Sequence, residues 1–215
     1  MDWHGRRVLT VIAHPDDETL GCGATLAKLS ALGAEVTVLL ALQRTDPRGV
    51  ANWDALLETF EAACTLLGCT AAVTDPLLLE SQAEPEVGRL HDVLLPWVED
   101  ADTVLTHWPG DVNQAHRGVA RAIEIATRPF RRHREVLLFE TPTSTDQTFF
   151  QAFSPNTWVV LDPEHCELAE AAMALYEIEH EIGRRPTDLR RRLEARGAEI
   201  GVPHAEAFVA TRRFA

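Results

Sequence analysis

The chain has 215 residues, of which 46% are hydrophobic, and it carries a formal net charge of −13. This length can bury one full core, so we expect residues 1–215 to form a single domain. An acidic chain repels phosphate backbones and anionic lipid headgroups, which argues against nucleic acid or a membrane surface as a partner. No apolar run approaches the roughly 20 residues of a spanning helix, and no secretory signal is visible at the N-terminus.

The cysteines indicate a reducing compartment. Cys22, Cys64, Cys69 and Cys166 show no CxxC spacing, so we interpret them as reduced, mostly buried thiols and not as a disulfide framework or zinc knuckle. We therefore expect the protein to be cytoplasmic. The sequence leaves a homo-oligomer open.

The first half of the chain alternates β-rich runs with helical patterns. The run at 34–42 is apolar almost throughout, as expected for a parallel strand covered on both faces. Repeated strand–helix units of this length predict right-handed crossovers and an open sheet, so we expect an α/β, Rossmann-like three-layer sandwich with a mostly parallel sheet. In chain order, the predicted strands are 7–13, 34–42, 71–75, 102–107 and 135–140, and the predicted helices run from the acidic residues after the first strand to Leu32, then over 53–67, 86–99 and 114–127.

The last third has a different pattern. An outlying strand is expected at 156–162, followed by helices over 166–182 and 188–201, and the chain finishes with "AEAFVATRRF". We therefore predict a C-terminal helical tail folded onto the domain. The arginine-rich segment 184–192 has two interpretations, a solvated helix end or a site that attracts phosphate or an acidic sugar.

Charged residues gather where the first strand ends, in the segment "AHPDDE". Ligands of open parallel sheets bind beyond the carboxyl ends of the strands, so His14 stands on the ligand side. One interpretation is helix capping by Asp16 or Asp17, but it does not account for the histidine or the rigid proline. The other is a metal site: His14 and Asp17 can point an imidazole and a carboxylate at one cation, with Asp16 as a free carboxylate beside it.

A second polar segment follows the strand at 102–107. It brings His107, Asp111, Asn113 and His116 to the same carboxyl edge of the sheet. His107 by itself is equally consistent with a core histidine satisfied by the backbone. His116 opens a helix, where a neutral, metal-binding imidazole is acceptable. Two strands that deliver histidine and aspartate to one edge are hard to explain by packing, and mixed nitrogen and oxygen ligands suit zinc.

These two segments together resemble a known family. "AHPDDE" after a first buried strand and "THWPGDVNQAHR" after a later one are similar to the LmbE-like or PIG-L family of zinc-dependent N-deacetylases. The resemblance extends through "ETPTSTDQTFFQAFSPNTWVVLD" to "AEAF", so it covers almost the whole chain. It implies a Rossmann-like enzyme that removes an N-acyl (acetyl) group from an amino sugar or a related glycoconjugate or natural-product intermediate. It further implies that His14, Asp17 and His116 bind Zn²⁺ and that Asp16 is the general base.

Two positions depart from the family pattern. Relatives usually have aspartate directly before the third ligand, where this chain has Ala115, and many have histidine, credited as the general acid, where it has Asn113. Ala115 has three explanations: a natural variant with chemistry reorganised around His107, a protein that lost deacetylation for another reaction or a binding role, or a deliberate substitution. Asp16, His107 and Asn113 are therefore the catalytic candidates. The alternative function is a metal-binding protein of the same fold with lost or repurposed chemistry.

Overall fold

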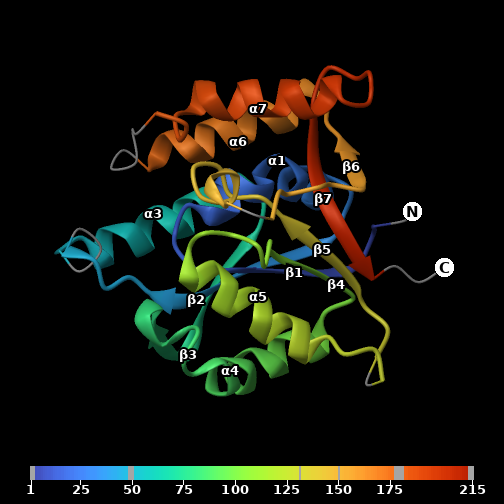
Figure 1. Ribbon diagram of the computed structural model, residues 1–215. Coiled ribbons are helices and arrows are strands. Elements are labelled where there is room, and N and C mark those ends of the chain that lie inside the picture. The colour runs from blue at the N-terminus through green and yellow to red at the C-terminus, as the bar shows by residue number, and fades with distance from the viewer. Residues whose placement is uncertain (1–2, 48–50, 131, 150, 177–181, 213–215) are drawn as a thin grey trace.

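The computed structural model describes residues 3–47, 51–130, 132–149, 151–176 and 182–212 (Figure 1). The described strands form one seven-stranded sheet in the order β3-β2-β1-β4-β5-β7-β6. The strands are β1 (Arg7–Ile12), β2 (Glu35–Gln43), β3 (Thr70–Leu79), β4 (Thr103–His107), β5 (Glu135–Phe139), β6 (Thr157–Val160) and β7 (Ala205–Arg212). The helices are α1 (Asp17–Ala31), α3 (Trp53–Leu66), α4 (Val87–Asp100), α5 (Gln114–Ala126), α6 (Pro163–Leu175) and α7 (Pro186–Ala198), with short 3-10 turns η1 (Glu80–Gln82) and η2 (Thr145–Gln147). Within the part of the chain described, none of these helices is long and apolar enough to cross a membrane.

The parallel part of the sheet contains a topological switch point. β1 pairs in parallel with both β2 and β4, and β2–β3 and β4–β5 are also parallel. From β1 the chain moves outward through β2 and β3, then returns to the other side of β1 with β4 and β5. Connections therefore diverge at the carboxyl ends of β1 and β4, which is where open sheets of this type bind ligands. The predicted Rossmann-like, mostly parallel architecture is confirmed.

Both faces of the central strands are covered by helices. Leu9 and Val11 of β1 pack in the apolar cluster beneath α4 and α5, whereas Val8 and Ile12 pack in the cluster beneath α1 and α3. Figure 1 shows α4 and α5 on one side of the sheet and α1 on the other. Because successive strand side chains point to opposite faces, a strand buried on both sides is mostly apolar, and β1 fits this pattern apart from Arg7 at its start and the buried Thr10.

The C-terminal third differs from the predicted helical tail. α6 and α7 are present and pack outside α1 and α3 in a third apolar cluster, but β7 follows them (Figure 1). β7 pairs antiparallel with β5 on one side and β6 on the other, and its first four residues are buried. In the sequence, α6 and α7 are thus inserted between β6 and β7, two neighbouring strands of the sheet. The helix predicted over 166–182 ends at Leu175, and residues 177–181 lie outside the described part.

Gly21 allows α1 to approach the sheet closely. A Cβ atom at residue 21 would lie 2.3 Å from Cδ2 of Phe139, whose ring is fully buried and packs edge-on against His107 with centroids 4.8 Å apart. We expect Gly21→Ala to lower the free energy of unfolding by about 1–3 kcal/mol through overpacking. Gly88→Ala in α4 is the control, because a Cβ there meets nothing within 4 Å. It should be neutral or stabilising by up to about 1 kcal/mol. Urea unfolding measures both, and equal effects would contradict the close contact.

Candidate metal centre and active site

The turn after β1 presents three polar side chains. Oδ2 of Asp17 accepts a hydrogen bond from the backbone N–H of His14 at 2.8 Å, which closes the turn. Asp16 occupies the N-cap position of α1, but it has φ 108° and its side chain makes no capping hydrogen bond. Capping therefore does not explain these acids. A positive φ at a non-glycine residue is strained, and such strain is concentrated at functional sites.

His14, Asp17 and His116 form one buried cluster, with one ligand atom from each residue lying within 4.8 Å of the others. Asp17 lies between the two histidines. Its Oδ1 is 3.3 Å from Nε2 of His116, and its Oδ2 is 3.6 Å from Nδ1 of His14. The fold thus brings together the ligand set that the family resemblance implied.

A second carboxylate lies behind each histidine. Oε2 of Glu80 is 3.0 Å from Nε2 of His14, on the side away from the nitrogen that faces Asp17. Oδ2 of Asp111 is 3.2 Å from Nδ1 of His116, an ion contact without good hydrogen-bond alignment. Carboxylates in this position orient metal-binding histidines and fix which nitrogen is free to bind. Glu80 was missed in the sequence, although it follows β3 directly and so stands at the same edge of the sheet.

The charges of the cluster favour a cation. Burial disfavours charge on His116, but Asp17 and Asp111 outweigh it and raise the pKa of His116 to about 9. Burial likewise opposes ionisation of Asp17, yet His116 holds its pKa well below the ordinary value. The hydrogen bond with His14 lowers the pKa of Glu80 to about 2. A buried nitrogen–oxygen–nitrogen donor set in which positive charge is stabilised fits zinc.

We expect Glu80→Gln to weaken zinc binding about 10- to 100-fold, the usual effect of losing a carboxylate behind a ligating histidine. The amide keeps the size of the side chain but loses the charge that fixes His14. Titration against a competing chelator measures the change. Glu84→Gln is the control, because Glu84 pairs with Arg117 at the surface. An unchanged zinc affinity in Glu80→Gln would show that His14 does not need this partner.

His107 lies directly against the cluster. Its ring stacks on His116 with centroids 4.1 Å apart and planes inclined by 9°. Its Nε2 accepts a hydrogen bond from the backbone N–H of Ala13 at 3.0 Å, and its Nδ1 lies 3.3 Å from Oγ1 of Thr141. Burial, reinforced by the charge of His116, lowers the pKa of His107 to about 4. A neutral ring with a partner at each nitrogen is suited to holding His116 and the turn in place.

Asn113 and Ala115 lie at the start of α5. Asn113 is the N-cap residue, and its Oδ1 accepts a hydrogen bond from the backbone N–H of Ala115 at 2.8 Å. Ala115 is 2% exposed and belongs to the apolar cluster beneath α4 and α5. A carboxylate at residue 115 would therefore have to be buried.

The arginine-rich segment is held largely by the protein's own acids. The arginines of α7 pair with acids of α7 and of neighbouring segments: Arg190 with Glu170, Arg191 with Asp188, Arg192 with Glu140 and Asp146, and Arg196 with Glu140 and Glu199. These contacts favour the structural interpretation of α7 over an anion site. Arg184, which precedes α7, differs from them because it contacts Asp16.

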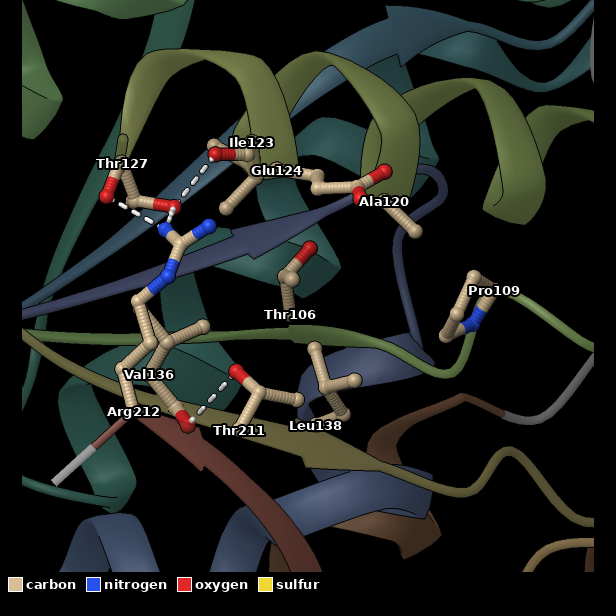
Figure 2. Close-up of a pocket in the computed structure, with 10 residues that line it drawn as sticks. All are labelled: Thr106, Pro109, Ala120, Ile123, Glu124, Thr127, Val136, Leu138, Thr211 and Arg212. Atoms are coloured by element: carbon tan, nitrogen blue, oxygen red, sulfur yellow. Dashed lines mark hydrogen bonds between the residues drawn. The ribbon is translucent and has the colours of Figure 1, made fainter. Parts of the chain in front are cut away.

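A separate cavity of about 230 Å³ lies between α5 and strands β4, β5 and β7. Figure 2 shows Arg212 of β7 at one end of it, donating hydrogen bonds to Thr127 at the end of α5. Among the residues that the structure describes, no histidine and no member of the cluster lines this cavity. It is therefore distinct from the candidate metal centre.

Comparisons with known proteins agree with this geometry. The family model described as "PIG-L: GlcNAc-PI de-N-acetylase" matches residues 9–127. The Escherichia coli (strain K12) protein called uncharacterized deacetylase YaiS is 25% identical over 175 residues, covering 77% of this chain and 88% of that protein. The 1D-myo-inositol 2-acetamido-2-deoxy-alpha-D-glucopyranoside deacetylase of Streptomyces scabiei is 32% identical over 136 residues, which cover 55% of this chain but only 38% of that longer protein. A solved deacetylase structure from the teicoplanin biosynthesis pathway has a TM-score of 0.76 at 18% identity and covers 96% of this chain and 98% of that one, which shows the shared fold.

Proposed function

This chain belongs to the PIG-L family, and we propose that it is a zinc-dependent N-deacetylase. Its substrate would be an N-acylated, in particular N-acetylated, amino sugar or a related glycoconjugate or natural-product intermediate. The observation that carries the proposal is the buried cluster of His14, Asp17 and His116 at the switch point of the sheet, with Asp16 beside it. The names of two relatives, a deacetylase of an acetamido sugar and a deacetylase of the teicoplanin pathway, support the substrate class.

We assign zinc to His14, Asp17 and His116. A zinc ion bound there would lower the pKa of a bound water toward neutrality and polarise the carbonyl of the scissile amide. Asp16 accepts the proton of the attacking water as general base. Glu80 and Asp111 hold the two histidines in the orientation that the metal requires.

The other two candidates have supporting roles. His107 positions His116 and the turn after β1, because its nitrogens already have partners in Ala13 and Thr141. Oδ1 of Asn113 accepts a hydrogen bond from the backbone of Ala115, so the N–H₂ group of the same amide points away from that backbone. We assign this amide to hydrogen bonding with the substrate.

The domain organisation and the compartment are also part of the proposal. All the described strands join one sheet, which supports a single domain over residues 1–215. The four cysteines are free thiols, which supports a reducing compartment such as the cytoplasm.

The direct test is amine release from N-acetylglucosamine and its glycosides. The metal-free protein should be inactive, and one equivalent of zinc should restore amine release. If the protein bound zinc but released no amine from N-acetylglucosamine or any of its glycosides, the alternative would be favoured. That alternative is a metal-binding protein of this fold with lost or repurposed chemistry.

We expect Ala115→Asp to leave turnover within about threefold of the parent and to destabilise the protein by about 1–3 kcal/mol, since it buries a polar group in an apolar cluster. The new carboxylate would also find no histidine at position 113 to orient, because that residue is asparagine. Steady-state kinetics and urea unfolding measure the two effects. A gain of more than tenfold in turnover would instead mean that the chain is impaired by its alanine.

A further inference from the structure

Arg184 connects three segments that are distant in the sequence. Its Nη1 donates a hydrogen bond to Oδ2 of Asp16, in the turn after β1, at 3.0 Å. Its Nε donates to Oγ1 of Thr143, in the loop after β5, at 2.8 Å. Arg184 itself directly precedes the first turn of α7. One guanidinium group therefore ties the turn that carries Asp16 to two other loops at the same edge of the sheet.

Both partners of Arg184 have strained backbones. Among the residues that the structure describes, Asp16 with φ 108° and Thr143 with φ 65° are the non-glycine residues with positive φ. This conformation is costly, most of all for a β-branched residue such as threonine, and it persists only where surrounding contacts enforce it. Arg184 bonds to the side chains of both strained residues, so they belong to one constrained arrangement.

Asp188 holds the backbone on both sides of Arg184. Oδ2 of Asp188, in the first turn of α7, accepts hydrogen bonds from the backbone N–H of Gly183 at 3.0 Å and of Arg185 at 3.4 Å. Gly183 has φ +96°, and a Cβ atom there would lie 2.5 Å from Cγ2 of Thr143. Glycine is therefore needed for the close approach of the two loops. Hydrogen bonds to Asp188 thus hold the main chain on both sides of Arg184, independently of the bond between the Arg184 side chain and Asp16.

We propose that Arg184 is the positioning residue for Asp16, an inference that rests on the proposed role of Asp16 as general base. The Asp16 side chain is 2% exposed and the Arg184 side chain 18%, so the pair is shielded from water. A general base must be held close to its productive orientation, and a planar guanidinium fixed by a second hydrogen bond restrains the rotation of a carboxylate. Arg184 therefore sets the direction in which Asp16 presents its carboxylate.

Other contacts hold the turn itself. The backbone N–H of Asp16 donates to Oε2 of Glu18 at 3.2 Å, and Oε1 of Glu18 accepts from the hydroxyl of Tyr176 in turn. The bond between Asp17 and the backbone of His14 also does not involve Arg184. Loss of the Arg184 side chain should therefore remove this restraint on the Asp16 carboxylate while leaving the turn and the assigned metal ligands in place.

The test compares Arg184→Met and Arg184→Lys with the matched control Arg190→Met. Arg190 pairs with Glu170 between α6 and α7, and within the described part of the chain it makes no hydrogen bond or ion pair with the turn after β1. We expect Arg184→Met to lower kcat tenfold or more, with KM within about threefold and one zinc retained per chain. Arg184→Lys should recover part of the loss, because lysine keeps the charge but lacks the two-pronged donor geometry. Arg190→Met should behave like the parent.

A double-mutant cycle decides whether Arg184 acts through Asp16. In the Asp16→Asn background, Arg184→Met should cost little further turnover, since residues that act as a unit are not additive. Additive losses would overturn the proposal, and so would a rise in KM at unchanged kcat, which would make Arg184 a substrate-binding residue. A parent without amine release would mean failure of the proposed function. In that case the free energies of unfolding of the two single variants and the double variant would test whether Arg184 and Asp16 interact. Additive changes in these free energies would overturn the proposed pairing.

Discussion

His14→Ala should yield a folded protein that no longer retains zinc and no longer releases amine. The imidazole is one of the three ligands that we assign to zinc, and its loss would leave Asp17 and His116 as an incomplete set for a tightly held ion. The fold should survive, because the hydrogen bond that closes the turn uses the backbone N–H of His14 and not its ring. Elemental analysis after dialysis measures the metal, and circular dichroism measures the fold.

His91→Ala serves as the control for this experiment. His91 lies on α4 and pairs with its neighbour Asp92, away from the cluster. The His91→Ala protein should retain one zinc per chain and release amine at the rate of the parent. Full zinc occupancy in His14→Ala would show that the assigned ligand set is wrong.

Asp16→Asn should keep zinc but lower turnover roughly a hundredfold or more, in the range for loss of a general base. The amide has the shape of the carboxylate and can still accept a hydrogen bond from Arg184, but it cannot take up a proton from water. Metal analysis and steady-state kinetics on one N-acetylated amino sugar measure the two properties.

Asp17→Asn provides the comparison, because Asp17 contacts both histidines of the cluster. This variant should lose zinc as well as activity. If Asp16→Asn lost zinc while Asp17→Asn kept it, the roles of the two aspartates would have to be exchanged.

Most of the central sheet could be predicted from local patterns. The mostly apolar run of β1 indicated a buried strand, that of β2 a parallel strand covered on both faces, and strand–helix alternation indicated parallel crossovers. The position of β7 was not predictable in this way. Its pairing with β5 and β6 depends on antiparallel contacts after two intervening helices, and no spacing within "AEAFVATRRF" specifies which strands it joins.

The same division holds for the candidate site. Local patterns were enough to identify the segments that carry His14, Asp16, Asp17 and His116, because each segment follows a recognisable buried strand whose carboxyl end must face the ligand side. The residues that support these side chains could be identified only in the folded chain. Glu80 meets His14 across 66 residues, and Arg184 meets Asp16 across 168. Such contacts depend on the order of the strands and on the packing of α6 and α7 over α1, which bring distant loops to one edge of the sheet.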